Sequence, residues 1–182
     1  KRGISSWHLV FPEQDVARSL LAAGLHRRTA TQFHWFNRGY SSFDDFLADF
    51  TSRKRKNLRR ERARVAEQGL TLRTLCGDEI SPREWQQFHH FYRMTYAKRS
   101  GHGCYLTREF FTQTAPRLGE QVIMVMACLE GRAVAGALYF CSRDTLYGRY
   151  WGCEQEYDCL HFETCYYQGI EYCIANGLQK FD

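Results

Sequence analysis

The spacing of apolar residues predicts four elements in the first third of the chain. The pattern is typical of a strand over Ser6–Phe11, a helix over Gln14–Ala23 and a second strand over Thr29–Phe36. Three phenylalanines and a leucine then recur at helical spacing, which predicts a short amphipathic helix over Phe43–Phe50. The chain therefore begins in the order strand, helix, strand, helix.

A longer series of elements begins at Leu70. Ser81-Pro-Arg-Glu84 has the sequence of a capping box, with proline at the first helical position. The order β-α-α-β-β-β-α-β indicates an α/β (α+β) fold with a mixed, mostly antiparallel sheet flanked by helices. The predicted elements are strand Leu70–Leu75, helices Pro82–Lys98 and Thr107–Leu118, strands Val122–Glu130, Val134–Ser142 and Thr145–Trp151, helix Asp158–Asn176 and strand Leu178–Phe181.

The composition adds three constraints. The chain has 182 residues, of which 44% are hydrophobic and 15% aromatic, and this excludes the disordered and low-complexity classes. The longest apolar run, Val122–Leu129, is far shorter than the roughly 20 residues of a membrane-spanning helix. The first residues contain neither an initiator methionine nor an apolar leader, and the last ones open a strand. We expect a piece of a longer cytoplasmic protein.

The eight cysteines predict buried thiols rather than disulfides. No two of them have the CxxC spacing of a metal or redox motif. Cys128 and Cys141 lie in apolar strand patterns, where a free cysteine acts as a small hydrophobe. Reduced cysteines are also the norm for a cytoplasmic protein. A metal site of Cys153, Cys159 and His161 is the weaker alternative, and the prediction is that no metal is bound.

Several longer segments resemble one protein family. Two of them look like the Fem-type branch of the GNAT superfamily: residues 46–62 with Gly69-Leu70, and residues 131–138 with residues 144–147. Three others resemble, more closely, a bacterial FemAB-like family labelled peptidoglycan biosynthesis or recognition. These three are Gln32-Phe-His-Trp-Phe-Asn37, Tyr147-Gly-Arg-Tyr-Trp-Gly152 and His161-Phe-Glu-Thr-Cys-Tyr-Tyr-Gln-Gly-Ile-Glu171.

The resemblance implies the GNAT-like acyl-CoA N-acyltransferase fold and a protein of two such halves. Residues 1–40 would be the tail of one half, residues 41–69 a basic helical connector and residues 70–182 the front of a truncated second half. Fem-type enzymes transfer an aminoacyl group from charged tRNA to an amine of a cell-wall peptide precursor. The expected function is therefore acyl or aminoacyl transfer without a cofactor, from an aminoacyl-tRNA or an acyl-CoA. An inactive module that binds peptidoglycan precursor and an acetyl-CoA-dependent N-acetyltransferase are the alternatives.

Residues 53–64 carry the one strong charge cluster. Eight of their side chains are basic and one is acidic, within a chain of net charge +5. Such density is costly without an anionic partner, although many basic helices are merely solvated. We expect a phosphate-bearing partner, either the acceptor end of a tRNA or a nucleotide-linked cell-wall precursor. The candidate contacts are Arg53, Lys54, Lys56, Asn57 and Arg60.

The last helix and the strand before it supply the candidate catalytic groups. Acyl transfer to an amine needs a base and donors for the oxyanion. Glu163 or His161 is the candidate base, and Tyr147, Arg149 or Tyr150 the candidate donor. Each also has a plain structural interpretation, as a helix-dipole partner or a packing residue.

The loop before that helix and the helix itself carry two further expectations. The loop holds Glu154, Glu156 and Asp158, whose charges should repel a coenzyme A pyrophosphate at the helix N-terminus. In the helix, seven residues at helical spacing predict the buried face. They are Phe162, Cys165, Tyr166, Gly169, Ile170, Cys173 and Ile174.

Overall fold

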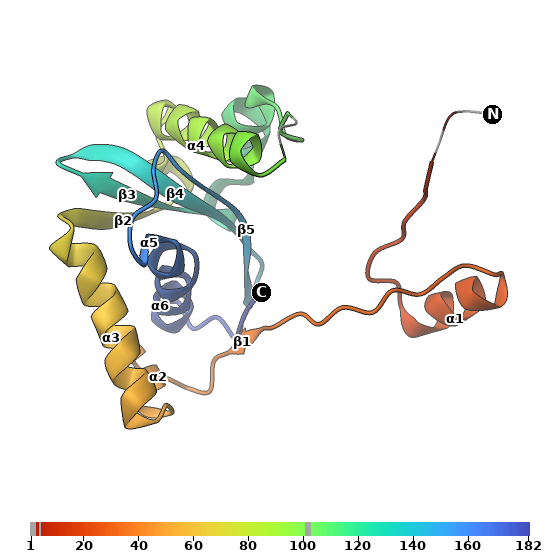
Figure 1. The fold of residues 1–182 in the computed structure, drawn as a ribbon, viewed down its shortest axis with the longest axis horizontal. Helices are drawn as coiled ribbons and strands as arrows, with labels where there is room; N and C mark the ends of the chain where they lie inside the picture. The colour runs from red at the N-terminus through yellow and green to blue at the C-terminus, as the bar shows by residue number, and fades with distance from the viewer. Residues whose placement is uncertain (1–2, 4, 101–102) are drawn as a thin grey trace. The chain divides into compact units, whose positions relative to one another are not determined.

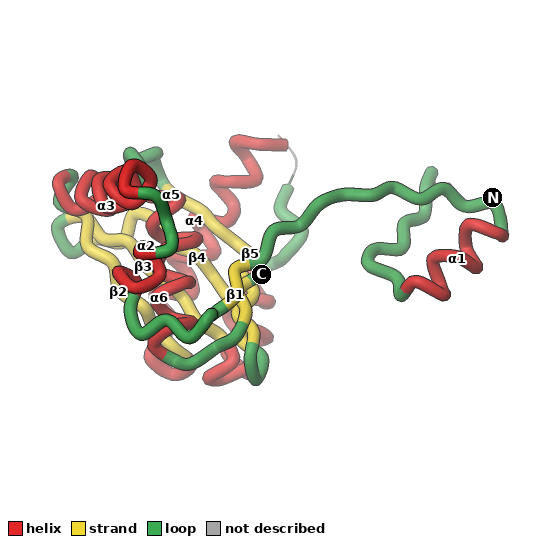
Figure 2. Tube along the Cα trace, turned by 90° about the horizontal axis from the view of Figure 1, so that it is seen from below, coloured by secondary structure: helices red, strands yellow, loops and turns green. Residues whose placement is uncertain are grey.

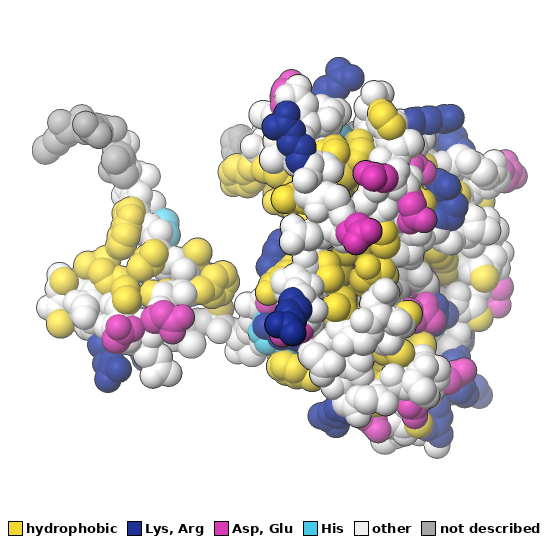
Figure 3. Space-filling view, turned by 180° about the vertical axis from the view of Figure 1, so that it is seen from behind, with side chains coloured by type: hydrophobic (Ala, Val, Ile, Leu, Met, Phe, Trp, Pro, Cys, Tyr) yellow, Lys and Arg dark blue, Asp and Glu magenta, His cyan; other side chains and the backbone are white. Residues whose placement is uncertain are grey.

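The computed structural model describes residue 3, residues 5–100 and residues 103–182. The chain divides into two compact units, Lys1–Phe33 and His34–Asp182. The first contains helix α1 (Gln14–Ala22), none of whose residues is buried. Hydrophobic side chains of this unit lie on its surface (Figure 3). The strand predicted over Ser6–Phe11 is wrong, because none of these residues belongs to the sheet of the described structure.

The second unit is built on one six-stranded sheet. Its order is β1-β6-β5-β4-β3-β2, and every neighbouring pair is antiparallel except β5 and β6. The prediction of a mixed, mostly antiparallel sheet is confirmed. The strands are β1 (Trp35–Phe36), β2 (Leu70–Cys76), β3 (Val122–Leu129), β4 (Arg132–Cys141), β5 (Thr145–Cys153) and β6 (Lys180–Phe181).

Helices cover both faces of this sheet (Figures 1 and 2). The long helix α4 packs on one face together with the irregular turns η2 and η3, and α2, α3, α5, η4 and α6 lie on the other. The last three form one continuous helix whose middle turn, η4, is π-helical. The bounds are α2 (Phe43–Ala48), α3 (Ser52–Glu67), η1 (Gly77–Glu79), α4 (Pro82–Ser100), η2 (Phe110–Thr114), η3 (Ala115–Gln121), α5 (Leu160–Phe162), η4 (Glu163–Tyr167) and α6 (Gln168–Ala175). Among the described residues, no helix combines the length and the apolar character that a membrane crossing requires.

The central strands are apolar throughout because both of their faces are covered. In β3, Met124 and Met126 pack under α4, whereas Ile123 and Val125 pack under α6. Side chains alternate between the faces of a strand, so a continuous apolar run is what a doubly covered strand requires. The run identified in the sequence is thus the middle of the core.

Local signals were predicted with mixed success. The capping box of α4 is confirmed: Ser81 N–H donates to Glu84 Oε2 at 2.8 Å, and Glu84 N–H to Ser81 Oγ at 3.3 Å. The second predicted strand shortens to β1, because β6 offers only two residues for pairing. The regular helix predicted over Thr107–Leu118 is wrong, since a π-helical turn and a 3-10 segment replace most of it.

The predicted buried stripe of the last helix is only partly confirmed. Gly169, Ile170 and Cys173 are buried, whereas Phe162 and Tyr166 are 54% and 47% exposed. The helix packs against α3 as well as the sheet, so its buried residues do not form a single stripe. All eight cysteines are free, as predicted.

One glycine sets the distance between α4 and the sheet. A Cβ atom added to Gly152 of β5 would lie 2.2 Å from the carbonyl carbon and oxygen of Phe91 in α4. Backbone cannot move aside as a flexible side chain can. Only glycine therefore permits this close packing of helix on strand.

Gly152→Ala is expected to lower the free energy of unfolding by about 3 kcal/mol or more, because α4 must lift from the sheet. Urea denaturation followed by circular dichroism measures the change. Gly103→Ala is the matched control, since its added Cβ meets no described atom within 4 Å. Equal stability of the two variants would contradict this account of the packing.

Candidate functional site

The basic helix α3 has two faces of different character. Leu58, Arg62 and Val65 recur at helical spacing on the face that packs against the rest of the unit. Basic side chains on or beside this face have partners within the protein. Arg59 pairs with Asp44 at 2.8 Å, and Arg55 donates to the Phe50 carbonyl oxygen at 3.3 Å. Arg59 is thus neutralised by a carboxylate, whereas Arg55 is bonded to backbone and keeps its charge.

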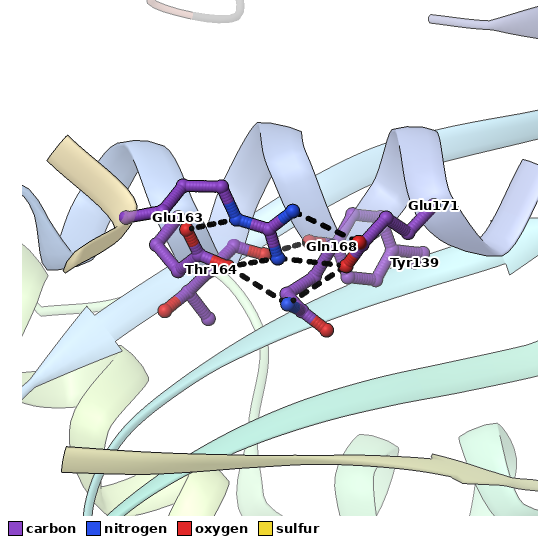
Figure 4. A network of polar contacts seen from close by, with 6 residues as sticks. Tyr139, Glu163, Thr164, Gln168 and Glu171 are labelled. Atoms are coloured by element: carbon purple, nitrogen blue, oxygen red, sulfur yellow. Dashed lines mark hydrogen bonds and ion pairs between the residues drawn. The ribbon is translucent and has the colours of Figure 1, made fainter. Parts of the chain in front are cut away.

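Arg62 is the centre of a polar network under α3 (Figure 4). Its guanidinium donates to both carboxylate oxygens of Glu163, from Nε at 3.0 Å and from Nη2 at 2.9 Å. It also donates to both oxygens of Glu171, each at 2.8 Å, and Gln168 Nε2 donates to Glu163 Oε1 at 2.8 Å. One cation thus joins α3 to two successive turns of the last helix.

The charges of this network stabilise one another. Burial disfavours the charged form of Arg62, but the bonds to Glu171 and Glu163 outweigh it and raise the pKa of the guanidinium. The Glu163 side chain is only 4% exposed. To act as the predicted general base, Glu163 would have to be released by Arg62, because its oxygens already accept three hydrogen bonds.

Two tyrosines complete the attachment of the last helix. Tyr139 of β4 donates to the Thr164 carbonyl oxygen, inside the wide turn η4. Tyr167 donates to Glu61 of α3. Burial raises the pKa of both hydroxyls, so they remain protonated donors at neutral pH. Sheet, last helix and α3 are therefore connected by polar contacts within an apolar core.

The outer face of α3 carries the predicted anion-binding residues. Arg53, Lys56, Asn57 and Arg60 stand at positions i, i+3, i+4 and i+7, which places them on one side of the helix. The three cations are exposed, and so is the neighbouring Lys54. Within the described part of the chain none of these four cations has a carboxylate partner; Arg60 bonds only Asn57, at 3.4 Å. We call Arg53, Lys54, Lys56, Asn57 and Arg60 the outer stripe.

The predicted catalytic residues do not come together in one place. His161 and Glu163 lie on the face of the sheet covered by α3 and the last helix, where the His161 ring stands 5.3 Å from that of Trp151. Tyr150 faces the opposite side and packs against Tyr92 of α4, with ring centroids 5.3 Å apart. The sheet separates these two groups.

Arg149 and Tyr147 form a second cluster on β5, at its edge toward β6. Leu138 of β4 opposes Tyr150, and the next residue opposes Gly148, so Arg149 is an extra residue in a β-bulge. Its guanidinium lies 5.2 Å from the Tyr147 ring centre and 3.6 Å from Asp182 Oδ1.

Asp182 and its neighbour His34 were not among the predicted site residues. The side-chain carboxylate of Asp182 is 12% exposed, and three basic side chains lie beside it. The feature that could have identified them is the register of β1 and β6, because it places these two residues opposite each other.

The acidic loop before α5 is partly neutralised. Glu154 pairs with Arg132 at 2.8 Å, and Asp158 with Arg64 at 3.4 Å. The helix predicted from Asp158 begins at Leu160 instead, and Cys159, in a left-handed conformation, occupies the N-cap position. Among the described residues no group of three or more histidine, cysteine or acidic side chains could hold a metal ion, so the weaker alternative of a site at Cys153, Cys159 and His161 is wrong.

A sequence model of one family, FemAB-like, described as peptidoglycan biosynthesis/recognition, matches residues 1–182. The chain belongs to the FemAB-like family. No curated protein matches this chain. The family assignment confirms the resemblance on which the expectations for fold and function rest.

Solved structures support the fold. FemX is 12% identical and superposes with a TM-score of 0.57 over 93% of this chain and 59% of its own. The C-terminal domain of a putative lysylphosphatidylglycerol synthetase from Agrobacterium fabrum is 14% identical, with a TM-score of 0.53 over 74% of this chain and 43% of its own. The FemAB-like chain thus has the GNAT-like fold and spans about half the length of these structures.

Replacing Arg62 tests the network. Arg62→Met leaves Glu163 and Glu171 close together without a cation, and the expected loss is about 3–5 kcal/mol in the free energy of unfolding. Arg59→Met is the control, because its pair with Asp44 is exposed and contributes less than about 1 kcal/mol. Equal losses in urea denaturation would show that the network does not anchor α3.

Proposed function

We propose that this FemAB-like chain is part of an acyl or aminoacyl transferase that acts on an amine of a cell-wall precursor or a related acceptor. In this proposal the outer stripe binds the phosphates of the donor or acceptor. The observation that carries the proposal is the separation of charge on α3: Arg59, Arg62 and Arg64 have carboxylate partners, whereas the cations of the outer stripe have none among the described residues.

The electrostatics favour a large phosphate-bearing ligand. The stripe extends over seven residues, which is about 10 Å along a helix and enough to contact more than one phosphate. Exposed like charges repel one another, and an anionic partner relieves this repulsion. Arg62 contributes indirectly: its two carboxylate partners more than balance its charge, and it holds the helix that carries the stripe.

A binding module without turnover is the second candidate. The observation that favours it is the engagement of Glu163, whose carboxylate is held by Arg62 and Gln168 and leaves little capacity for proton transfer. Such a module would use the same outer stripe to hold a nucleotide-linked precursor. The two candidates differ in whether an acyl group is transferred.

Binding measurements on the full-length protein test the stripe. The combination Arg53→Ala, Lys56→Ala and Arg60→Ala should weaken binding of aminoacyl-tRNA or of a nucleotide-linked cell-wall precursor by about tenfold or more. It should also flatten the salt dependence, because each lost phosphate contact lowers the slope of log K against log salt by about 0.7–0.9.

The control is Arg83→Ala, Arg93→Ala and Lys98→Ala, which removes three exposed cations of α4. It changes the net charge equally but leaves the stripe intact. Equal affinities of both triple variants for both ligands would contradict the proposal.

Coenzyme A provides a separate test of the acetyltransferase alternative. Glu154, Glu156 and Asp158 precede α5 by two to six residues along the chain, and two of the three are paired with arginines, so a pyrophosphate at the start of α5 would meet like charge from this loop. We expect no micromolar binding of coenzyme A in calorimetry at low ionic strength, where screening is weak. Micromolar affinity for coenzyme A would favour the acetyl-CoA-dependent N-acetyltransferase instead.

A further inference from the structure

The edge of the sheet at β1, β6 and β5 gathers a cluster of charges around one carboxylate. His34 Nδ1 lies 3.5 Å from Asp182 Oδ2, Lys180 Nζ lies 3.7 Å from the same oxygen, and Arg149 Nη1 lies 3.6 Å from Oδ1. The Asp182 carboxylate is thus nearly enclosed and electrostatically stabilised.

The register of the strands fixes this arrangement. Trp35 pairs with Phe181 and Phe36 with Lys180, so the antiparallel ladder places His34 directly opposite Asp182. The Asp182 backbone is held on its other side, where its N–H donates to Leu146 O and its carbonyl oxygen accepts from Gly148 N–H, both at 2.9 Å. The pair therefore lies directly beside β1 and β6, where backbone hydrogen bonds hold Asp182 against β5.

The cluster lies on the same face as the tyrosines of β5. Phe181 and Leu146 pack into the core under α6, so their neighbours along the strands, Asp182 and Tyr147, face the other side. Tyr150 also faces that side. This groups the predicted oxyanion donors with His34 and separates them from His161 and Glu163.

The surroundings of His34 are those of a general base whose hydrogen bond to its positioning residue has not formed. Nδ1 is buried and makes no hydrogen bond, because the 3.5 Å contact with Asp182 is longer than a normal bond. The side chain is 26% exposed, so the ring is open to solvent away from Nδ1. Catalytic hydrogen bonds are often long without substrate and shorten when it binds.

We propose that His34 is the general base of acyl transfer, that Asp182 positions it, and that Arg149 stabilises the oxyanion. This inference rests on the proposed function, and it places the reacting centre at the β1–β6–β5 edge, on the opposite side of the sheet from Glu163.

The proposed step forms an amide bond, breaks the ester or thioester bond and moves one proton through His34. The amine nitrogen of the acceptor attacks the carbonyl carbon of an acyl ester or thioester, and His34 Nε2 takes a proton from that nitrogen as the N–C bond forms. Arg149 donates hydrogen bonds to the negatively charged oxygen. The C–O or C–S bond then breaks, and the leaving oxygen or sulfur receives the proton from His34. Asp182 remains ionised and stabilises the imidazolium in between.

Asp182 acts through His34 and does not touch the substrate. Asp182→Asn should therefore lower kcat about tenfold or more, while the KM for the acceptor stays within threefold of the wild-type value.

The test measures transfer of a radiolabelled amino acid from total aminoacyl-tRNA, and of acetyl from acetyl-CoA, to a nucleotide-linked peptide precursor by the full-length protein. His34→Gln should lower kcat/KM about 100-fold or more. Added imidazole should partly restore His34→Ala, an effect that a purely structural histidine would not show. His90→Gln, on the exposed side of α4, is the control and should transfer at the wild-type rate.

Two results would overturn the inference in distinguishable ways. In the first, the wild type transfers the acyl group and the rate of His34→Gln is within threefold of the wild-type rate. His34 is then not the base, and the proposed function still stands. No transfer by wild type from either donor would remove the proposed function and this inference together. Thermal unfolding of each variant shows whether a loss of rate reflects a loss of fold.

Discussion

The partly buried ion pairs of Arg62 are the interaction on which the arrangement of the unit depends. Arg62 is the one α3 side chain bonded to both Glu163 and Glu171, so it links a basic helix to the helix that crosses over to β6. Buried charges are costly unless every donor and acceptor is used, and here nearly all of them are. The network therefore fixes the rotation of α3, which determines the direction in which the outer stripe points.

The sheet register is the second constraint, because it brings the residues of the proposed reacting centre together at one edge. The parallel pairing of β5 with β6 requires the crossover helix, and the two-residue pairing of β1 with β6 brings His34 from far along the sequence. The bulge at Arg149 turns an extra side chain toward that edge. In the two proposals, phosphate binding on α3 and proton transfer at the sheet edge therefore belong to different parts of the unit His34–Asp182.

Local sequence signals predicted most of the elements, but they did not predict how the elements meet. The β2–β5 strands and the capping box of α4 followed from patterns within a few residues. The basic run also identified the residues of the outer stripe. It did not show which cations of the run have carboxylate partners. Arg62 belonged to that run, and only the packing of α3 against the last helix shows that it differs from Arg60.

The candidate site was harder to predict because its residues are distant in the chain. Asp182 and His34 meet only through strand pairing, which depends on the whole fold. Glu163 looked like a base because it begins a helix, but its partner Arg62 lies 101 residues earlier. The strand predicted at Ser6–Phe11 failed for the same reason: its apolar residues are strand-like, yet no neighbouring strand pairs with them.

The kinetics of the stripe variant test the central claim most directly. Rates of amino acid transfer by the full-length protein are measured while the concentration of aminoacyl-tRNA is varied, for wild type and for the triple variant at Arg53, Lys56 and Arg60. The account predicts a KM for the donor that rises about tenfold or more with an unchanged kcat, since the stripe binds phosphate and takes no part in the chemistry. A fall in kcat at constant KM would contradict it.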